Sequence, residues 1–328
     1  MNRIEFGDCR DIMRRWANEG VRVQTCVTSP PYFGLRDYGV EGQIGLEQTP
    51  EEYIAAMVEV FRCVRDVLAD DGTLWLNIGD SYAGGNTGGK WREGSARADG
   101  DVRDDGHSRR NRNGNGAVSG CKPKDLIGIP WMLAFALRAD GWFLRQDIIW
   151  HKPNPMPESV RDRCTKAHEY VFLLSKSDRY FFDSEAMKEP AVSEKPAGNK
   201  RHKYADAYAA GKSEEHRTKA GLLSLASVEW QKRNRRSVWT VATRPYKGAH
   251  FATFPPALIE PCILAGCPEG GTVLDPFGGS GTTAGVALAH GRNAVLCELN
   301  EEYAALVPDR VDSILARSPW FGLPGGAV

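Results

Sequence analysis

Several features that define other classes of protein are missing from this 328-residue sequence. No apolar run approaches the roughly 20 residues of a membrane-spanning helix, and the opening residues, MNRIEFGDCRDIMRRW, contain no apolar core of a signal peptide. The eight cysteines form no C-x-x-C pair, and no histidine stands near them at zinc-finger spacing. We therefore expect a cytoplasmic protein with free thiols, without a membrane partner and without a metal site.

The sequence also has no net charge, but its charges are unevenly distributed. Between Lys188 and Lys247, fourteen lysines and arginines stand against six acidic residues, a surplus of eight positive charges. A locally basic segment in a neutral protein is typical of a surface that binds a polyanion, whereas the alternative is a solvated charged loop.

The apolar patterns predict strands alternating with helices. A strand at 23–29, a helix at 49–72 with Thr49 as its N-cap, and a strand at 73–80 imply a parallel sheet. Further along, the same patterns predict a helix at 126–141, strands at 142–152 and 168–177, a helix at 255–266, a strand, glycine loop and helix within 271–291, a strand at 292–300, and a terminal helix.

Residues 83–120 are rich in glycine, asparagine, arginine and aspartate and nearly empty of large aliphatic side chains. Such a segment cannot bury enough apolar surface to order itself, so it is predicted to be a mobile loop. Its arginines could contact a nucleic-acid backbone, or the segment could be an inert linker.

The glycine loop near the end of the chain indicates a cofactor site. Gly278, Gly279 and Gly281 stand between a strand that ends in Asp275 and a predicted helix, and Glu298 ends the following strand. In a strand-helix-strand unit, such glycines let a ligand approach the backbone, and the acidic residue accepts hydrogen bonds from ribose hydroxyls. The pattern predicts a nucleoside-containing cofactor, either NAD or S-adenosyl-L-methionine. The alternative is a tight turn with an exposed Glu298.

Two short strings resemble the motifs of the DNA amino-methyltransferases, which methylate N4 of cytosine or N6 of adenine. DPFGGSGTT, starting at Asp275, resembles their cofactor motif, and TSPPY, ending at Tyr32, resembles their catalytic motif. Three longer strings resemble further segments of the family: FGDCRDIM, WHKPNPMPESVRDRCTKAHEYVFLLSK and HFATFPPALIEPCI. The catalytic motif precedes the cofactor motif, with the basic segment between them, which resembles the permuted β arrangement of this family.

The resemblance implies a Rossmann-like α/β fold, with a mostly parallel sheet and an inserted target-recognition region. The implied boundaries are a catalytic half at 1–187, the recognition region at 188–247 and a cofactor-binding half at 248–328. The implied cofactor is S-adenosyl-L-methionine. The contacts carried over from the family are Asp8, Phe251, Thr253, Phe254, Asp275, Phe277, Gly278, Gly279, Gly281, Thr282 and Glu298.

The catalytic motif implied by the resemblance has a clear chemical logic. The amino group of a base is a poor nucleophile because its lone pair is delocalised into the ring, and acceptors aimed at both N–H bonds favour pyramidal nitrogen. The Ser29 side chain and the Pro30 carbonyl would be these acceptors, and the rigid prolines Pro30 and Pro31 would hold them without offering an N–H donor. Tyr32 would stack on the flipped base.

Two other chemistries fit the sequence less well. Ser29 lacks the G-x-S-x-G elbow and the partnered histidine of a hydrolase. Pro261-Cys262 has the residue order of a cytosine-C5 methyltransferase nucleophile, but it lies in an apparent apolar helix, so Cys262 is interpreted as a core residue.

The recognition region predicts contacts to double-stranded DNA. It interleaves aromatic residues with basic ones that suit phosphates and guanine edges: Lys232, Arg233, Arg235, Arg236 and Arg244. The target amine stays open, since a serine at the first motif position leans towards cytosine only by family habit. Family habit also favours a homodimer. The rival hypotheses are a nicotinamide-dependent oxidoreductase, a non-catalytic DNA-binding protein with a methyltransferase fold and, more weakly, an enzyme acting on RNA.

Overall fold

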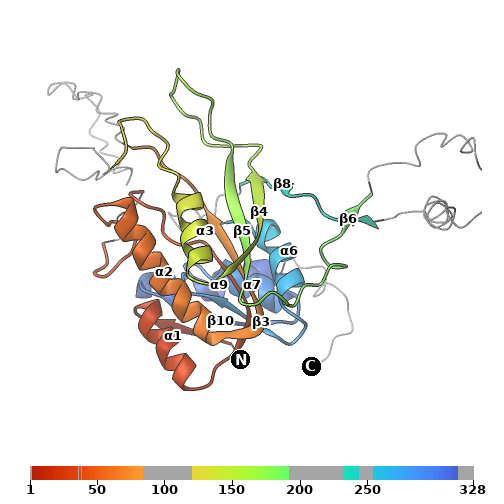
Figure 1. Cartoon of the computed structure of the whole chain (residues 1–328). Helices are drawn as coiled ribbons and strands as arrows, with labels where there is room; N and C mark the ends of the chain where they lie inside the picture. Colours follow the sequence, from red (N-terminus) through yellow and green to blue (C-terminus); the bar gives the residue numbers. More distant parts are fainter. Residues whose placement is uncertain are drawn as a thin grey trace, which may run out of the picture. The chain divides into compact units, whose positions relative to one another are not determined.

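The computed structural model describes residues 2–35, 37, 39–83, 120–191, 232–243 and 254–316 (Figure 1). The chain divides into two compact units, one made of Met1–Asp183 and Ser237–Val328, the other of Ser184–Arg236. Residues 84–119 of the predicted mobile loop and most of the predicted recognition region lie outside the described residues. Within the smaller unit, β6 (Glu189–Pro190) pairs antiparallel with β7 (Lys232–Arg233).

The larger unit is organised around an eight-stranded sheet in the order β1-β10-β9-β2-β3-β5-β4-β8. Among these strands β5 runs antiparallel to both of its neighbours, and the other pairs are parallel, which confirms the predicted α/β fold with a mostly parallel sheet. The strands are β1 (Arg3–Phe6), β2 (Val23–Thr28), β3 (Leu68–Ile78), β4 (Phe143–His151), β5 (His168–Ser175), β8 (Val238–Thr240), β9 (Thr272–Asp275) and β10 (Asn293–Glu298).

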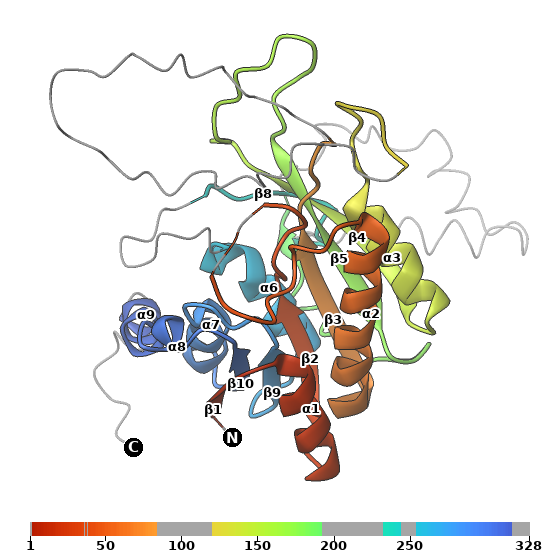
Figure 2. The same ribbon diagram turned by 90° about the vertical axis from the view of Figure 1, so that its left-hand side faces the viewer.

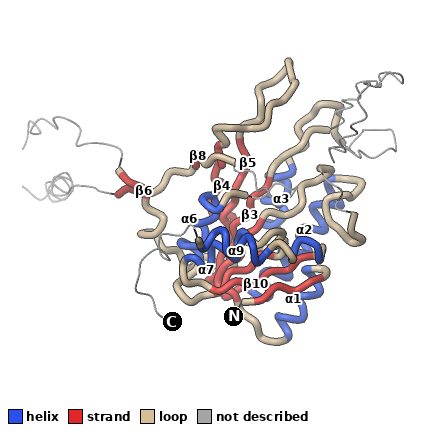
Figure 3. Tube along the Cα trace, turned by 180° about the vertical axis from the view of Figure 1, so that it is seen from behind, coloured by secondary structure: helices blue, strands red, loops and turns tan. Residues whose placement is uncertain are grey.

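Helices cover both faces of this sheet (Figures 2 and 3). Side chains of β3 alternate between the faces: Leu74 joins the core beneath the first three helices, whereas Trp75 lies against Gly266 on the other face. The first face carries α1 (Cys9–Asn18), α2 (Pro50–Val67) and α3 (Ile129–Ala139). The second carries α6 (Pro256–Gly266) and α7 (Thr282–Ala289), with α8 (Glu301–Ala304) and α9 (Val307–Leu315) following β10.

The junction between α2 and β3 differs from the sequence prediction. Thr49 forms the expected N-cap, within a reciprocal capping box with Glu52, but the helix ends at Val67 rather than at Gly72. The register between β2 and β3 shifts here, so that residues 69–72 on the β3 side stand opposite Gln24 alone on β2. Backbone carbonyls of this stretch accept hydrogen bonds from Lys176 and Phe181 instead of from a further helical turn. Tertiary pairing thus overrides the local helical pattern.

The strand order reverses between β2 and β9. From β2 the chain passes through α2 to β3 on one side, and from β9 it passes through α7 to β10 on the other. In open α/β sheets, the crevice outside the carboxyl ends of the strands at such a reversal is the usual ligand site. The fold therefore places the expected site where β2 and β9 end.

Candidate active site

The two motifs that are far apart in the sequence meet at the ends of β2 and β9. These strands pair in register, with Cys26 opposite Leu274. Just past this pair, the Thr28 hydroxyl donates to Asp275 Oδ1 at 2.7 Å, and the Thr283 hydroxyl donates to Asp275 Oδ2 at 2.6 Å. The catalytic motif and the cofactor motif therefore share one hydrogen-bonded junction.

Asp275 lies behind this junction rather than on an open surface. Its side chain is buried, its Oδ1 also accepts the backbone N–H of Phe277 at 3.1 Å, and burial raises the pKa of the carboxyl against the opposing hydrogen bonds from Thr283 and Thr28. Both carboxylate oxygens are engaged by protein donors. A direct contact between Asp275 and the cofactor stays a prediction. In the structure, Asp275 links the catalytic motif to the cofactor motif.

The glycines of the loop differ in what surrounds them. A side chain at Gly278 would collide with Leu296 of β10, and one at Gly281, where φ is +84°, would collide with Val307 of α9. Gly279, with φ of +50°, has only the Phe277 carbonyl oxygen nearby, at 3.9 Å from an added Cβ. Two of these glycines are thus required by protein packing, and Gly279 leaves open space above the backbone.

Ser280 is the polar residue of the loop that sequence reasoning passed over. Its hydroxyl is buried and has no hydrogen-bond partner among the residues that the structure describes. Buried hydroxyls are normally satisfied, so an orphaned one between the cofactor-loop glycines indicates a missing polar partner.

Glu298 lies at the carboxyl end of β10 and faces the glycine loop. Its Oε2 accepts the backbone N–H of Gly279 at 2.7 Å, and its Oε1 accepts that of Asn300 at 2.9 Å. Burial raises the pKa of this carboxyl, although both backbone hydrogen bonds oppose the shift. A carboxylate has about four lone-pair positions, so two remain for ligand hydroxyls.

The other predicted cofactor residues are placed as follows. Asp8 is the N-cap of α1 and binds Arg10, which lowers the pKa of its carboxyl, and its neighbour Gly7 donates to the Glu298 carbonyl at 2.9 Å. Thr282 is buried and accepts from Arg310 at 3.1 Å. Phe277 is half-buried against the core, and Phe254 is half-buried just before α6. Phe251 and Thr253 lie outside the described residues.

The catalytic loop is anchored through one carbonyl and leaves another open. The buried Tyr53 of α2 donates its hydroxyl to the Pro31 carbonyl at 2.8 Å. The carbonyl of Pro30 accepts no hydrogen bond from the part of the chain that the structure describes. Neither proline can donate one, so the Pro30 carbonyl stays unused next to Ser29 in the sequence. The Ser29 hydroxyl makes a long contact of 3.5 Å to the Tyr32 hydroxyl.

Tyr32 is held by residues that the sequence analysis missed. Its hydroxyl donates to Glu169 Oε2 of β5 at 2.7 Å and lies 3.4 Å from Asn77 Oδ1 of β3. An added Cβ at Gly79 would come within 2.7 Å of the Tyr32 ring, and Lys152 pairs with Glu169 from the end of β4. Polar residues at the ends of otherwise apolar strands were the available signal for Asn77 and Glu169.

Four of the predicted DNA-binding cations lie in the smaller unit, and Arg244 falls outside the described residues. Arg233 and Arg236 each donate to Glu189 Oε1, at 2.8 Å and 3.1 Å, while Lys232 is exposed and Arg235 is half-buried. One guanidinium nitrogen of Arg233, Nη2, is buried and has no hydrogen-bond partner among the residues that the structure describes.

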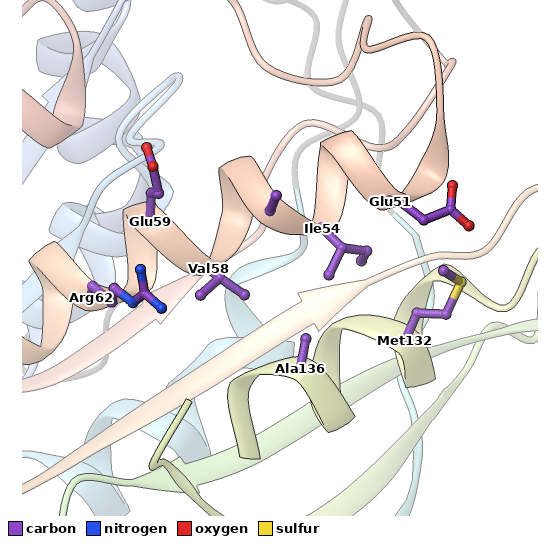
Figure 4. A pocket seen from close by; sticks show the side chains of 8 residues that line it. Glu51, Ile54, Val58, Glu59, Arg62, Met132 and Ala136 are labelled. Carbon is purple, nitrogen blue, oxygen red and sulfur yellow. The ribbon is translucent and has the colours of Figure 1, made fainter. Parts of the chain in front are cut away.

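All eight cysteines are free thiols, and Cys262 is buried in α6, which confirms its interpretation as a core residue. In the described ranges, no cluster of three or more histidine, cysteine or acidic side chains could hold a metal, and no helix is long and apolar enough to cross a membrane. A pocket between α2 and α3 (Figure 4) is lined by none of the predicted site residues.

A reversed strand order with a glycine loop and an acidic strand end at the reversal defines an α/β nucleoside-binding protein. A family model described as DNA methylase (N6_N4_Mtase) matches residues 23–308, and the chain belongs to this family. S-adenosyl-L-methionine, predicted above, is the cofactor of this family.

Relatives and solved structures agree with this assignment. The chain is 48% identical to the type II methyltransferase M.SmaI of Serratia marcescens, covering 94% of this chain and 90% of the relative. It is 47% identical to M.XycI of Xanthomonas campestris pv. cyanopsidis, covering 93% and 86%. The fold is similar to that of the cytosine-N4-specific PvuII DNA methyltransferase, with a TM-score of 0.57, 18% identity and coverage of 96% and 92%. It is also similar to the M1.HpyAVI complex with S-adenosylmethionine, with a TM-score of 0.53, 14% identity and coverage of 95% and 100%.

Proposed function

We propose that this protein transfers a methyl group from S-adenosyl-L-methionine to the exocyclic amine of a base flipped out of double-stranded DNA. The observation that carries the proposal is the junction at Asp275, which ties the strand leading into Ser29 to the glycine loop. A methyl donor held by that loop and an amine held by Ser29 would lie at the same edge of one sheet.

The residues present fit the proposed cofactor. The orphaned Ser280 hydroxyl offers a polar group to a bound molecule, and the open space above Gly279 admits a ligand against the backbone. The free lone pairs of Glu298 can accept ribose hydroxyls. A bound S-adenosyl-L-methionine would supply an electrophilic sulfonium methyl. A nicotinamide-dependent oxidoreductase would leave Ser29, Pro30 and the basic segment without a role.

The protein's own groups would act by position and electrostatics. The Ser29 oxygen and the Pro30 carbonyl would accept the two N–H bonds of the target amine, drawing its lone pair out of conjugation towards the methyl. Tyr53 fixes the loop by binding the adjacent Pro31 carbonyl, so the acceptors are positioned before the substrate arrives. The Tyr32 ring, braced by Glu169, would stack on the flipped base.

The target amine is proposed to be N4 of cytosine rather than N6 of adenine, because the first position of the motif is a serine. Lys232, Arg233, Arg235, Arg236 and Arg244 are proposed to contact DNA. A homodimer, a cytoplasmic location and the boundaries 1–187, 188–247 and 248–328 stay predictions from the sequence.

Long-read modification mapping of a methylation-free host that expresses the chain tests base and recognition sequence together. We expect N4-methylcytosine in one short motif, abolished by Ser29→Ala. N6-methyladenine would overturn the choice of base alone, whereas a Ser29→Ala variant with wild-type methylation would overturn the catalytic assignment. A comparison of the binding of labelled S-adenosyl-L-methionine and labelled NAD distinguishes the methyltransferase from a nicotinamide-dependent oxidoreductase. Faster methylation of an RNA copy of the motif than of the DNA would overturn DNA as the substrate.

A further inference from the structure

The loop that joins β4 to β5, residues 152–167, extends away from the sheet at the catalytic edge (Figures 1 and 2). β4 reaches this edge with its carboxyl end, and the antiparallel β5 leaves it with its amino end. The two ends of the loop are fixed beside the active site, because Lys152 pairs with Glu169 and Glu169 binds the Tyr32 hydroxyl.

Both arms of the loop are held in place. On one arm, Asn154 exchanges side-chain and backbone hydrogen bonds with Thr243, at 3.0 Å and 3.1 Å. On the other arm, Arg163 binds Glu158 and lies over the Tyr82 ring, 4.0 Å from its centroid. The first arm has the sequence PNPMP, residues 153–157, which places three prolines in five residues, and each proline fixes one backbone angle.

The tip of this braced loop carries Met156, whose side chain is 78% exposed. Among the large apolar side chains that the structure describes it is the most exposed, ahead of Leu35 and Val238 at 59% each. A fully extended chain advances at most about 3.5 Å per residue, so Met156 lies within about 14 Å of Lys152 at the edge of the site. A rigid support that holds an apolar side chain in water indicates a partner that receives it.

The charge of the loop identifies the chemistry of that partner. Four basic residues stand in it against two acidic ones: the bases are Lys152, Arg161, Arg163 and Lys166, and the acids are Glu158 and Asp162. Four of these six residues form ion pairs: Lys152 with Glu169, Arg163 with Glu158, and Asp162 with Lys124. An apolar tip rimmed by cations suits a nucleic-acid duplex, in which phosphates flank an apolar base stack. Methionine is among the side chains that proteins insert between base steps.

We propose that Met156 enters the duplex at the target site and occupies the space left in the base stack when the target base moves into the active site. This inference rests on the proposed function, since it requires a flipped base. Extrusion of a paired base costs stacking energy, and the inserted side chain would replace part of the stacking that is lost.

The test compares Met156→Ala with wild type on two duplexes that carry the recognition sequence, one with a normal pair at the target base and one with a mismatch there. On the paired duplex we expect kcat/KM of Met156→Ala to fall at least about tenfold, because the variant cannot fill the gap. On the mismatched duplex the loss should shrink to less than about threefold, since a mismatched base leaves the stack more easily. Met156→Leu should restore most of the activity.

Two further variants sharpen the comparison. Phe143→Ala removes another exposed apolar side chain, at the opposite end of β4, and should behave like wild type on both duplexes. Leu35→Ala tests the exposed residue near Tyr32. The inference would be overturned if Met156→Ala were as active as wild type, or if its defect were equal on both duplexes. It would also be overturned if the mismatch rescued Leu35→Ala and not Met156→Ala. A wild-type protein that methylates neither duplex would instead overturn the proposed function, and with it this inference.

Discussion

The Thr28 hydroxyl donates to the Asp275 carboxylate at 2.7 Å, although 247 residues separate them in the chain. Thr28 precedes the residue proposed to hold the target amine, and Asp275 precedes the loop proposed to hold the methyl donor. The distance between the two reacting groups therefore depends on a hydrogen bond between buried side chains.

Thr28→Val should weaken both the fold and the chemistry. The substitution leaves a buried carboxylate oxygen with one donor fewer, so the free energy of unfolding should fall by about 1–3 kcal/mol, and kcat should fall as the two motifs lose their fixed spacing. Thr25→Val is the matched control: Thr25 is buried on the same strand, but its hydroxyl binds the Thr73 carbonyl at 3.0 Å. Chemical denaturation and single-turnover rates measure both effects. A kcat lowered equally in the two variants would argue against a special role for the junction.

Ser280→Ala should separate stability from cofactor binding. Removing an unsatisfied buried hydroxyl is expected to leave the free energy of unfolding unchanged or raise it by up to about 1 kcal/mol, while the dissociation constant for S-adenosyl-L-methionine rises. Ser175→Ala provides the contrast, because the buried Ser175 hydroxyl donates to the Ser177 carbonyl at 2.7 Å and its loss should only destabilise the fold. Titration calorimetry measures this dissociation constant. An unaltered value in Ser280→Ala would show that this hydroxyl does not bind the cofactor.

Cofactor affinity should depend on pH through Glu298. Because burial raises the pKa of this carboxyl above its ordinary value of 4.5, it takes up a proton at a higher pH than an exposed glutamate does. A protonated carboxyl is a weaker acceptor for ribose hydroxyls, so affinity should fall as pH is lowered towards that pKa and be retained above it. Glu298→Gln should bind more weakly at neutral pH and lose most of this dependence, which equilibrium binding across pH would reveal. A wild-type affinity that is flat over the whole range would contradict the assignment.

Glu169→Gln should act through Tyr32 rather than through the fold. Loss of the charged acceptor weakens the hydrogen bond that holds the Tyr32 hydroxyl, and we expect kcat to fall about tenfold, equivalent to about 1.4 kcal/mol, with a smaller change in KM. In a double-mutant cycle with Tyr32→Phe the two losses should not add. Asp140→Asn, which removes a carboxylate paired with the exposed Arg62, is the control and should keep wild-type activity. Additive losses in the cycle would place Glu169 in a separate role.

Much of this site could be predicted from the sequence, because glycine loops and rigid prolines have local causes. DPFGGSGTT and TSPPY mark where two strands end, and the strand order then brings them together at Thr28 and Asp275. Individual roles within the motifs were harder to assign. Gly278 and Gly281 are required because they pack closely against Leu296 and Val307, and no local sequence pattern reveals these contacts.

The residues that sequence reasoning missed owe their positions to strand pairing. Glu169 reaches Tyr32 because β5 runs antiparallel beside β3, and a hydrophobic pattern does not specify strand direction. The predicted end of α2, at Gly72, was wrong for a related reason. Backbone carbonyls of residues 69–72 accept hydrogen bonds from the turn after β5 instead of from a further helical turn. Local propensity cannot anticipate such long-range partners.

The reversed direction of β5 also bears on how proteins of this kind can diversify. A parallel strand in its place would need a crossover helix, and no hairpin would rise from the catalytic edge. With β5 reversed, residues between Lys152 and Glu169 can be lengthened, shortened or exchanged while both ends of the segment stay attached to the sheet. New target preferences could then arise by exchange of one short surface element, without rebuilding the half of the sheet that holds the methyl donor.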